Sequence, residues 1–266
     1  MTADSPATPS SHPSATRRRL LDRVLLRVQV AAVEPLAART RRIVLAGAPL
    51  IDLPWTPGQS VSVLFVDPSA PGSWLRNPRD MKRSYSVWDA DPTAGRLELA
   101  VYDHGGDSPG ATWSRTVQPG DDVITTKPDG HLTARPDAAH HLFVGDDTAA
   151  VPLSAILRAL PAGTEARAIF ECDDPADELP PPGARDATAT FRTTWVHRKG
   201  ASAASSPLLP RAVAELDLPE QPGVAYVAGE ARTVQSVRNH LVNDRGWPRR
   251  AVLTEPFWTP GKRGMD

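Results

Sequence analysis

The sequence predicts two domains, a six-stranded antiparallel β-barrel followed by an α/β domain with a parallel sheet. In the first half, short runs of alternating apolar and polar residues are separated by Pro and Gly turns, which is typical of a small barrel. After about residue 137, apolar strands alternate with helix-like segments, which indicates a parallel sheet with helices on its faces. A chain of 266 residues is long enough for two modest domains. We place a disordered tail at 1–19, the barrel at 20–136 and the α/β domain at 137–266.

The strands expected in the barrel show alternation and β-branched residues between turn signals. Glu34-Pro35 lies between the first two expected strands, and a turn at Trp55–Ser60 precedes the third. The six expected strands are Val24–Val33, Thr40–Leu45, Val61–Val66, Lys82–Val87, Arg96–Tyr102 and Asp122–Lys127.

The second half alternates strands with helices, and several motifs follow strand ends. The expected strands are His141–Val144, Ala166–Cys172, Ala189–Val196 and Ala225–Ala228, and the expected helices are Ala149–Leu160, Pro207–Leu216 and Glu230–Asp244. Gly145, His197-Arg198 and Gly229-Glu230 fall at the carboxyl ends of strands, where ligands bind in sheets of this kind. We therefore expect these motifs to converge on one edge of the sheet.

The stretch from Lys82 to Gly120 carries the clearest chemical signal. Strand alternation places Arg83 and Tyr85 on one face and Ser84 and Ser86 on the other. A cation beside an aromatic ring suits a ligand with a phosphate and a flat ring system. The small residues of 104–113 lead into a helix expected near Pro109, whose first N–H groups favour an anion. The pattern indicates a flavin site, and a solvated strand with an ordinary loop is the alternative.

Composition excludes several classes of protein. Lys and Arg (30) nearly balance Asp and Glu (31), which argues against a nucleic-acid binder. The single cysteine, Cys172, excludes an internal disulfide and fits a reducing compartment. Its place in an expected strand indicates a packed strand residue. The histidines show no metal-ligand spacing, and no apolar run reaches membrane-spanning length. We expect a cytoplasmic monomer with no membrane and no nucleic-acid partner.

The order of these motifs resembles the siderophore-interacting protein family, the FAD-binding ferric-siderophore reductases of the ferredoxin-reductase-like superfamily. The resemblance runs from about Arg23 to the C-terminus. Besides the Arg83–Ser86 stretch, it is carried by Val144–Ala149, Trp195–Arg198, Val227–Ala231 and Pro256–Gly264.

The resemblance implies that the barrel holds FAD. Arg83 would pair with the pyrophosphate, Tyr85 would pack along the isoalloxazine, and Ser86 would lie near its N5. The remaining FAD candidates are Ser84, Tyr102, His104, Gly110, Ala111, Thr112 and Trp113. Relatives often carry Ser or Thr at the position of Ala111, so a phosphate contact there would pass to the backbone or to Thr112. The alternatives are a barrel-wall role for Tyr85 and a plain loop role for His104.

For the α/β half, the resemblance implies a site for NADPH or NADH. The candidate residues are Asp146, Thr148, Arg198 and Glu230. In the family the C-terminal tail folds back towards the flavin region, which makes Phe257 and Trp258 cofactor-binding candidates and Lys262 and Arg263 the substrate-side candidates. Two carboxylates repel an anion, so helix capping is the alternative for Asp146 and its neighbour. Arg198 and Lys199 are candidates for a 2′-phosphate, and a solvated basic pair is the alternative. The Gly-x-Gly-x-x-Gly fingerprint of an ordinary dinucleotide site is absent.

The implied function is a ferric-siderophore reductase. NAD(P)H would deliver a hydride to the flavin, and single electrons would then pass to siderophore-bound Fe(III), so that Fe(II) is released. No acid or base side chain is required. Two alternatives stay open, namely a flavoenzyme of secondary metabolism acting on an organic substrate and a non-catalytic siderophore-binding protein. The sequence leaves open NADH, NADPH or ferredoxin as donor, and which siderophore is bound.

Overall fold

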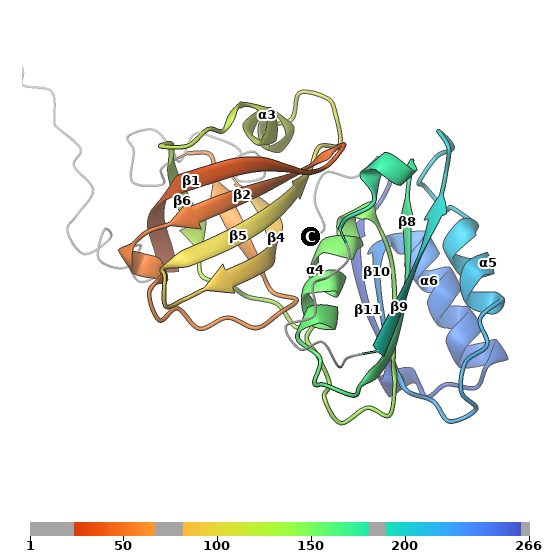
Figure 1. Cartoon of the computed structure of the whole chain (residues 1–266). Coiled ribbons are helices and arrows are strands. Elements are labelled where there is room, and N and C mark those ends of the chain that lie inside the picture. Colours follow the sequence, from red (N-terminus) through yellow and green to blue (C-terminus); the bar gives the residue numbers. More distant parts are fainter. Residues whose placement is uncertain (1–23, 67–81, 181–189, 262–266) are drawn as a thin grey trace, which may run out of the picture.

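The protein folds into a β-barrel and a parallel sheet that lie side by side (Figure 1). The structure is a computed structural model that describes residues 24–66, 82–180 and 190–261. Lys262, Arg263 and the predicted tail lie outside the described residues. The last barrel strand ends at Thr126 and the first sheet strand begins at His141. The domain limits drawn above at residues 19 and 136 stay predictions.

The first half forms the predicted six-stranded antiparallel barrel, which is closed in the order β1-β2-β5-β4-β3-β6. Its strands are β1 Leu25–Ala37, β2 Thr40–Ala46, β3 Ser60–Leu64, β4 Lys82–Asp91, β5 Arg96–Tyr102 and β6 Asp122–Thr126. Closure leaves no unpaired sheet edge, and inward residues such as Ile43, Val87 and Leu99 are fully buried. Helix α3, Pro109–Thr116, lies against the outside of the barrel between β5 and β6 in the chain (Figure 1).

The first strand is longer than the sequence predicts. We expected Glu34-Pro35 to end it, but β1 continues to Ala37 and pairs with β2 up to the Ala37–Thr40 register. Register shifts occur between Val30 and Ala32 and between Pro35 and Ala37. Proline lacks an N–H group and is tolerated at such irregularities, so it does not end this strand.

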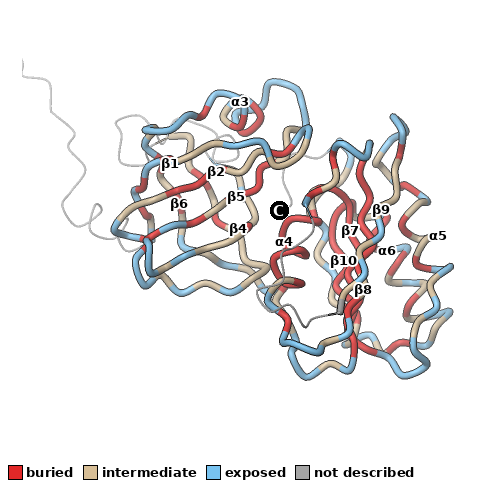
Figure 2. The backbone as a smooth tube through the Cα atoms, in the orientation of Figure 1, coloured by how far each residue is buried: buried red, intermediate tan, exposed pale blue. Residues whose placement is uncertain are grey.

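The second half forms a five-stranded parallel sheet in the order β11-β10-β7-β8-β9. Its strands are β7 His141–Asp146, β8 Glu165–Cys172, β9 Thr190–His197, β10 Val224–Glu230 and β11 Val252–Trp258. Helix α4, Asp147–Arg158, covers the face toward the barrel, and α5, Leu208–Ala214, and α6, Ala231–Asn239, cover the other (Figure 1). A π-helical turn, His240–Asp244, continues α6. Figure 2 shows the buried residues running along the central strands and α4. Cys172 is buried at the end of β8.

The two domains share a hydrophobic cluster. Trp88 of β4 and Ala100 of β5 are buried together with the apolar face of α4, including Ile156. The Arg158 guanidinium lies 4.1 Å from the centroid of the Trp88 ring and also donates to the Trp88 carbonyl. This packing brings the carboxyl edge of the sheet against the barrel. Among the described residues, we find no helix that combines the length and apolar character needed to cross a bilayer.

Candidate functional site

One group of predicted residues meets where β4 contacts α3. A Cβ added at Gly110 would lie 2.9 Å from Cγ of Arg83 and 3.0 Å from the Tyr85 hydroxyl. The Tyr85 ring lies 5.2 Å from that of Trp113, and its hydroxyl is 3.4 Å from the Gly110 carbonyl oxygen. Arg83 and Tyr85 therefore share one face, as strand alternation predicts, and the missing Cβ leaves room for both.

The start of α3 is the predicted anion-favouring helix end. Pro109 is its first residue, and the Ser108 hydroxyl accepts a hydrogen bond from the Ala111 N–H at 3.3 Å. Ala111 is buried and Thr112 is exposed. The Ser108 side chain thus caps the helix at the Ala111 N–H, while the Thr112 side chain faces solvent.

On the other strand face, the two predicted serines pair with β3. Ser84 and Ser62 share a hydrogen bond of 3.2 Å between their hydroxyls, and Ser86 lies opposite Ser60 in the ladder.

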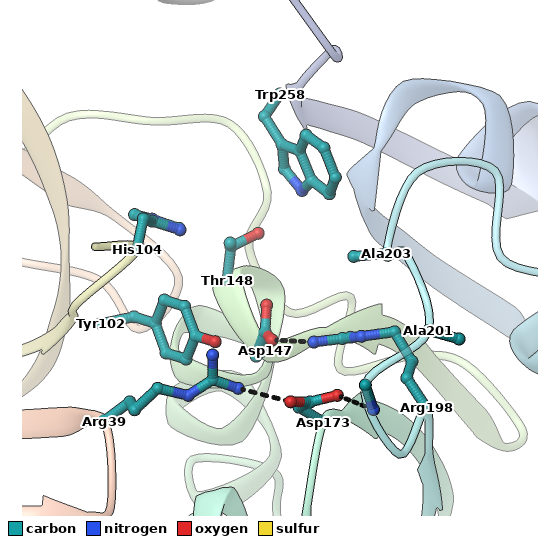
Figure 3. Close-up of a pocket in the computed structure, with 11 residues that line it drawn as sticks. Arg39, Tyr102, His104, Asp147, Thr148, Asp173, Arg198, Ala201, Ala203 and Trp258 are labelled. Carbon is teal, nitrogen blue, oxygen red and sulfur yellow. Dashed lines mark hydrogen bonds and ion pairs between the residues drawn. The ribbon is translucent and has the colours of Figure 1, made fainter. Parts of the chain in front are cut away.

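A second group lines a cavity of about 400 Å³ at the boundary between the barrel and the carboxyl edge of the sheet (Figure 3). Both domains contribute walls. The lining residues are Arg39, Tyr102, His104, Asp147, Thr148, Asp173, Arg198, Gly200, Ala201, Ala203 and Trp258. Tyr102, His104, Thr148, Arg198 and Trp258 were predicted from the sequence, and they come together here.

Asp146 lies directly behind this cavity and joins three strand ends. Its Oδ1 caps α4 by accepting from the N–H groups of Thr148 and Ala149, at 3.0 and 3.2 Å. Its Oδ2 accepts from the Glu230 N–H at 2.9 Å and from the Trp258 indole Nε1–H at 2.8 Å. Burial raises the pKa of Asp146, the nearby Asp147 adds to the effect, and these hydrogen bonds oppose it.

A glycine is required beside this carboxylate. Gly229 has a φ of 121°, and a Cβ there would lie 2.6 Å from Cγ of Asp146. A side chain would therefore displace the carboxylate that holds Trp258. Glu230, the next residue, caps α6 by accepting from the Thr233 N–H at 2.8 Å. Asp146 thus acts as a helix cap, which is the alternative considered from the sequence, and Glu230 caps a second helix.

Arg198 is buried in an ion-pair network in the cavity wall. It donates to Asp147 at 2.7 Å and to Glu171 at 3.2 Å, and Glu171 also accepts from the Ser206 hydroxyl at 2.7 Å. Burial alone would lower the pKa of Arg198, yet its two carboxylate partners hold that pKa above the ordinary value. Burial raises the pKa of Glu171, and its bonds to Ser206 and Arg198 oppose the rise. The guanidinium of Arg198 is therefore already paired with two carboxylates. Its role as a phosphate ligand stays a prediction.

Arg39 and Asp173 are site residues that sequence reasoning missed. Arg39 lies in the turn between β1 and β2, and its guanidinium is 5.2 Å from the centroid of the Tyr102 ring. It crosses to the other domain, bonding to Asp177 at 2.8 Å and lying 3.6 Å from Asp173. Asp173 directly follows the predicted strand Ala166–Cys172, so its place at the edge was available from the sequence. No sequence pattern indicated a site role for Arg39.

Phe257, a cofactor-binding candidate of the C-terminal tail, is partly buried. It packs against the hydrophobic cluster shared by the domains, next to Trp258 at the end of β11.

Comparison with known proteins decides the family. Residues 29–132 match the siderophore-interacting FAD-binding domain, and residues 138–261 match the siderophore-interacting protein family. The chain belongs to the siderophore-interacting protein family. The resemblance stated from the sequence is thus confirmed, and the barrel is the family's FAD-binding domain.

Known relatives of this siderophore-interacting protein include a reductase and a transporter. Ferric vibriobactin reductase ViuB of Vibrio cholerae is 26% identical over 238 residues, covering 83% of this chain and 84% of that protein. The mycobactin import ATP-binding/permease protein IrtA of Mycobacterium tuberculosis is 26% identical over 211 residues, covering 75% of this chain. The chain spans only about a quarter of the length of the IrtA proteins it matches.

Solved structures agree with the fold. A siderophore utilization protein from T. fusca superposes with a TM-score of 0.74 at 26% identity, covering 91% of this chain and 95% of that one. Ferredoxin-NADP+ reductase from Plasmodium falciparum gives a TM-score of 0.68 at 11% identity, covering 88% and 96%. The predicted ferredoxin-reductase-like fold is confirmed.

The barrel residues fit FAD. The Gly110 backbone lies close to Arg83 and Tyr85, at a helix start where N–H groups favour phosphate. An aromatic ring and a cation on one strand face, beside a helix end, supply the contacts that a dinucleotide with a flat ring needs.

Proposed function

We propose that this protein reduces siderophore-bound Fe(III), with FAD held by the barrel and NAD(P)H as donor. When bound, FAD would supply the redox chemistry: two electrons would arrive as a hydride from the nicotinamide and would leave singly to two Fe(III) ions. The ferric reductase activity named for ViuB, which covers nearly the same span, supports the reaction.

The single observation that carries the proposal is the cavity between the domains. It is lined by Tyr102 and His104 of the barrel and by Thr148 and Trp258 of the sheet edge. Ligands of parallel sheets bind beyond the carboxyl ends of the strands, so a nucleotide there reaches the barrel side.

Four of the predicted barrel residues have a proposed task. Arg83 would bind the FAD pyrophosphate, Tyr85 would pack along the isoalloxazine, and Ser86 would lie near its N5. Gly110 admits both larger side chains and the ligand. The protein orients the two reactants and excludes water between them, and no side-chain acid or base is needed. The substrate roles of Lys262 and Arg263, a cytoplasmic location and a monomeric state stay predictions.

The test uses the purified full chain. We expect bound FAD in its absorption spectrum, anaerobic bleaching by NADH or NADPH, and Fe(II) release from ferric chelates, detected with ferrozine. A flavin that bleaches without Fe(II) release from any chelate would favour a flavoenzyme acting on an organic substrate. A colourless protein that does not bind added FAD would refute the proposal.

A further inference from the structure

The turn between β1 and β2 makes a contact that joins the two domains. Arg39 of this turn donates from Nε and Nη2 to the two carboxylate oxygens of Asp177, at 3.1 and 2.8 Å. Beside it, the Ala38 N–H donates to the Ala176 carbonyl oxygen at 2.8 Å. Both partners belong to the short 3-10 helix Pro175–Asp177, which follows β8. The tip of the β1–β2 hairpin therefore binds the α/β domain through a side chain and a backbone group.

The 3-10 helix that receives Arg39 is itself fixed. The Asp174 carboxylate caps it by accepting from the Ala176 N–H at 3.0 Å, and the Asp177 side chain is only 5% exposed. The hydrogen bond with Asp177 raises the pKa of Arg39 above its ordinary value, so the guanidinium stays charged. A guanidinium that donates two hydrogen bonds to one carboxylate is a directional contact. The contact therefore sets an orientation as well as a distance.

On the barrel side, Arg39 contacts the strand that forms one wall of the cavity. Its guanidinium lies 5.2 Å from the centroid of the Tyr102 ring, and its carbonyl oxygen accepts from the Asp103 N–H at 2.8 Å. The Tyr102 ring lies 4.8 Å from the His104 ring, edge to face. In Figure 3, Arg39 lies beside Tyr102 and its guanidinium points toward Asp173, 3.6 Å away. One residue thus contacts both the barrel wall and the sheet-edge wall.

The other contact between the domains is apolar and lies elsewhere. Trp88 of β4 packs against α4, and the Arg158 guanidinium covers its ring. The hydrophobic effect is non-directional, so this packing alone would leave the domains free to rotate about it. Arg39 binds the segment after β8 and not α4, so its contact with Asp177 opposes this rotation.

We propose that Arg39 is a positioning residue for the reductase reaction proposed above, on which this role rests. It fixes the angle between the domains, so that groups bound at the barrel and at the sheet edge meet in one geometry. It acts through Asp177, which does not line the cavity. A displacement of about 1 Å can lower a rate roughly a hundredfold. Loss of the contact should therefore lower kcat and leave the affinity for either bound group nearly unchanged.

The test compares variants on the two sides of the contact, in the FAD-loaded full chain. Arg39→Met should lower the maximal rate of anaerobic flavin reduction by NADH or NADPH about tenfold or more. The Kd for FAD and the KM for the nucleotide should change less than about threefold. Asp177→Ala should have the same effect, and the double variant should lose no more than either single variant. Arg39→Lys keeps a cation within reach of Asp177 and should recover part of the rate.

Arg42→Met is the matched control. Arg42 also donates to carboxylates, at 2.7 Å to Glu98 and at 2.7 Å to Glu34, but all three residues belong to the barrel. Its loss should leave the rate and the KM unchanged. A second measurement does not depend on turnover. Hydrogen exchange of the Ala38 amide, followed by NMR, should become about tenfold faster or more in Arg39→Met and should not change in Arg42→Met.

Three results would overturn the positioning role and leave the reductase intact, provided that the unaltered protein still reduces its flavin. A higher KM with an unchanged kcat in Arg39→Met would make Arg39 a ligand-binding residue. An equal loss of rate in Arg42→Met would make the effect one of general stability. Unchanged exchange at Ala38 would show that the contact does not hold the domains together. If neither nucleotide bleaches the flavin of the unaltered protein, the nucleotide-donor role fails, and the positioning role fails with it.

Discussion

Replacing Arg198 with methionine tests the buried ion-pair network at the sheet edge. Methionine keeps much of the apolar stem but removes the charge, so Glu171 and Asp147 lose their cation. Glu171 is 1% exposed and Asp147 is 9% exposed. Carboxylates buried to this degree must then stay charged without a partner or take up a proton, and either response destabilises the folded state.

The magnitude follows from burial. Removing one partner of a buried pair costs about 3–5 kcal/mol, because the remaining charge is uncompensated. For a domain of this size, that corresponds to a fall in melting temperature on the order of 10 °C. Glu171→Gln combined with Arg198→Met should recover part of the loss, since one uncompensated carboxylate is then absent.

Calorimetric melting at neutral pH measures the effect. The matched control is Arg211→Met, because Arg211 pairs with Glu215 at 2.8 Å on the surface, with side chains 78% and 64% exposed. We expect no measurable change in that control. An Arg198→Met protein that melts within a degree of the unaltered protein would show that the network contributes nothing to stability, and the reasoning from burial would be wrong.

Three further predictions concern buried groups. His141 is 1% exposed and burial lowers its pKa to about 4, so stability that is present above pH 6.5 is lost as the pH falls toward 4. His141→Phe should therefore remove roughly 2 kcal/mol of this acid sensitivity, measured by urea titrations at pH 7 and pH 4.5. Gly110→Ala places a Cβ 3.0 Å from the Tyr85 hydroxyl and should weaken FAD binding at least tenfold by fluorescence titration, whereas an unchanged Kd would contradict the fit described above. Asp146→Asn puts an NH2 group against N–H donors and should speed exchange of the Trp258 indole proton in NMR, and an unaltered exchange rate would count against the role of that carboxylate.

The sequence predicted the architecture because its signals are local. Alternation and turn residues identified the barrel strands, with β5 predicted to the residue as Arg96–Tyr102. The β1 boundary was wrong because Pro35 is a strong local signal for a break, and tertiary pairing with β2 overrides it. The start of α4 was expected two residues late, because the Asp146 cap could belong to either the strand or the helix.

The candidate site was only partly predictable. Residues at strand ends converge by topology, which placed Thr148 and Arg198 at one edge of the sheet, whereas Trp258 was predicted from the family resemblance of the C-terminal tail. Arg39 belongs to a turn of the other domain, and nothing in its neighbours shows that it reaches Asp177, 138 residues away. Pairing also decides what a cation does. Arg198 looks like a phosphate ligand in the sequence, yet the contacts with Asp147 and Glu171 are visible only in the fold.

These contacts bear on how the domains move. Interfaces between domains allow relative motion unless they are large and hydrophobic. Here, separating the domains would expose Trp88, which is now only 6% exposed. It would also break the ion pair of Arg39 with Asp177, in which the Asp177 side chain is 5% exposed. It would also part the backbone bond from the Ala38 N–H to the Ala176 carbonyl, 2.8 Å long. Because the same Arg39 lines the cavity, the cavity walls are held in place before any ligand binds, which lowers the entropy cost of aligning a donor with the barrel.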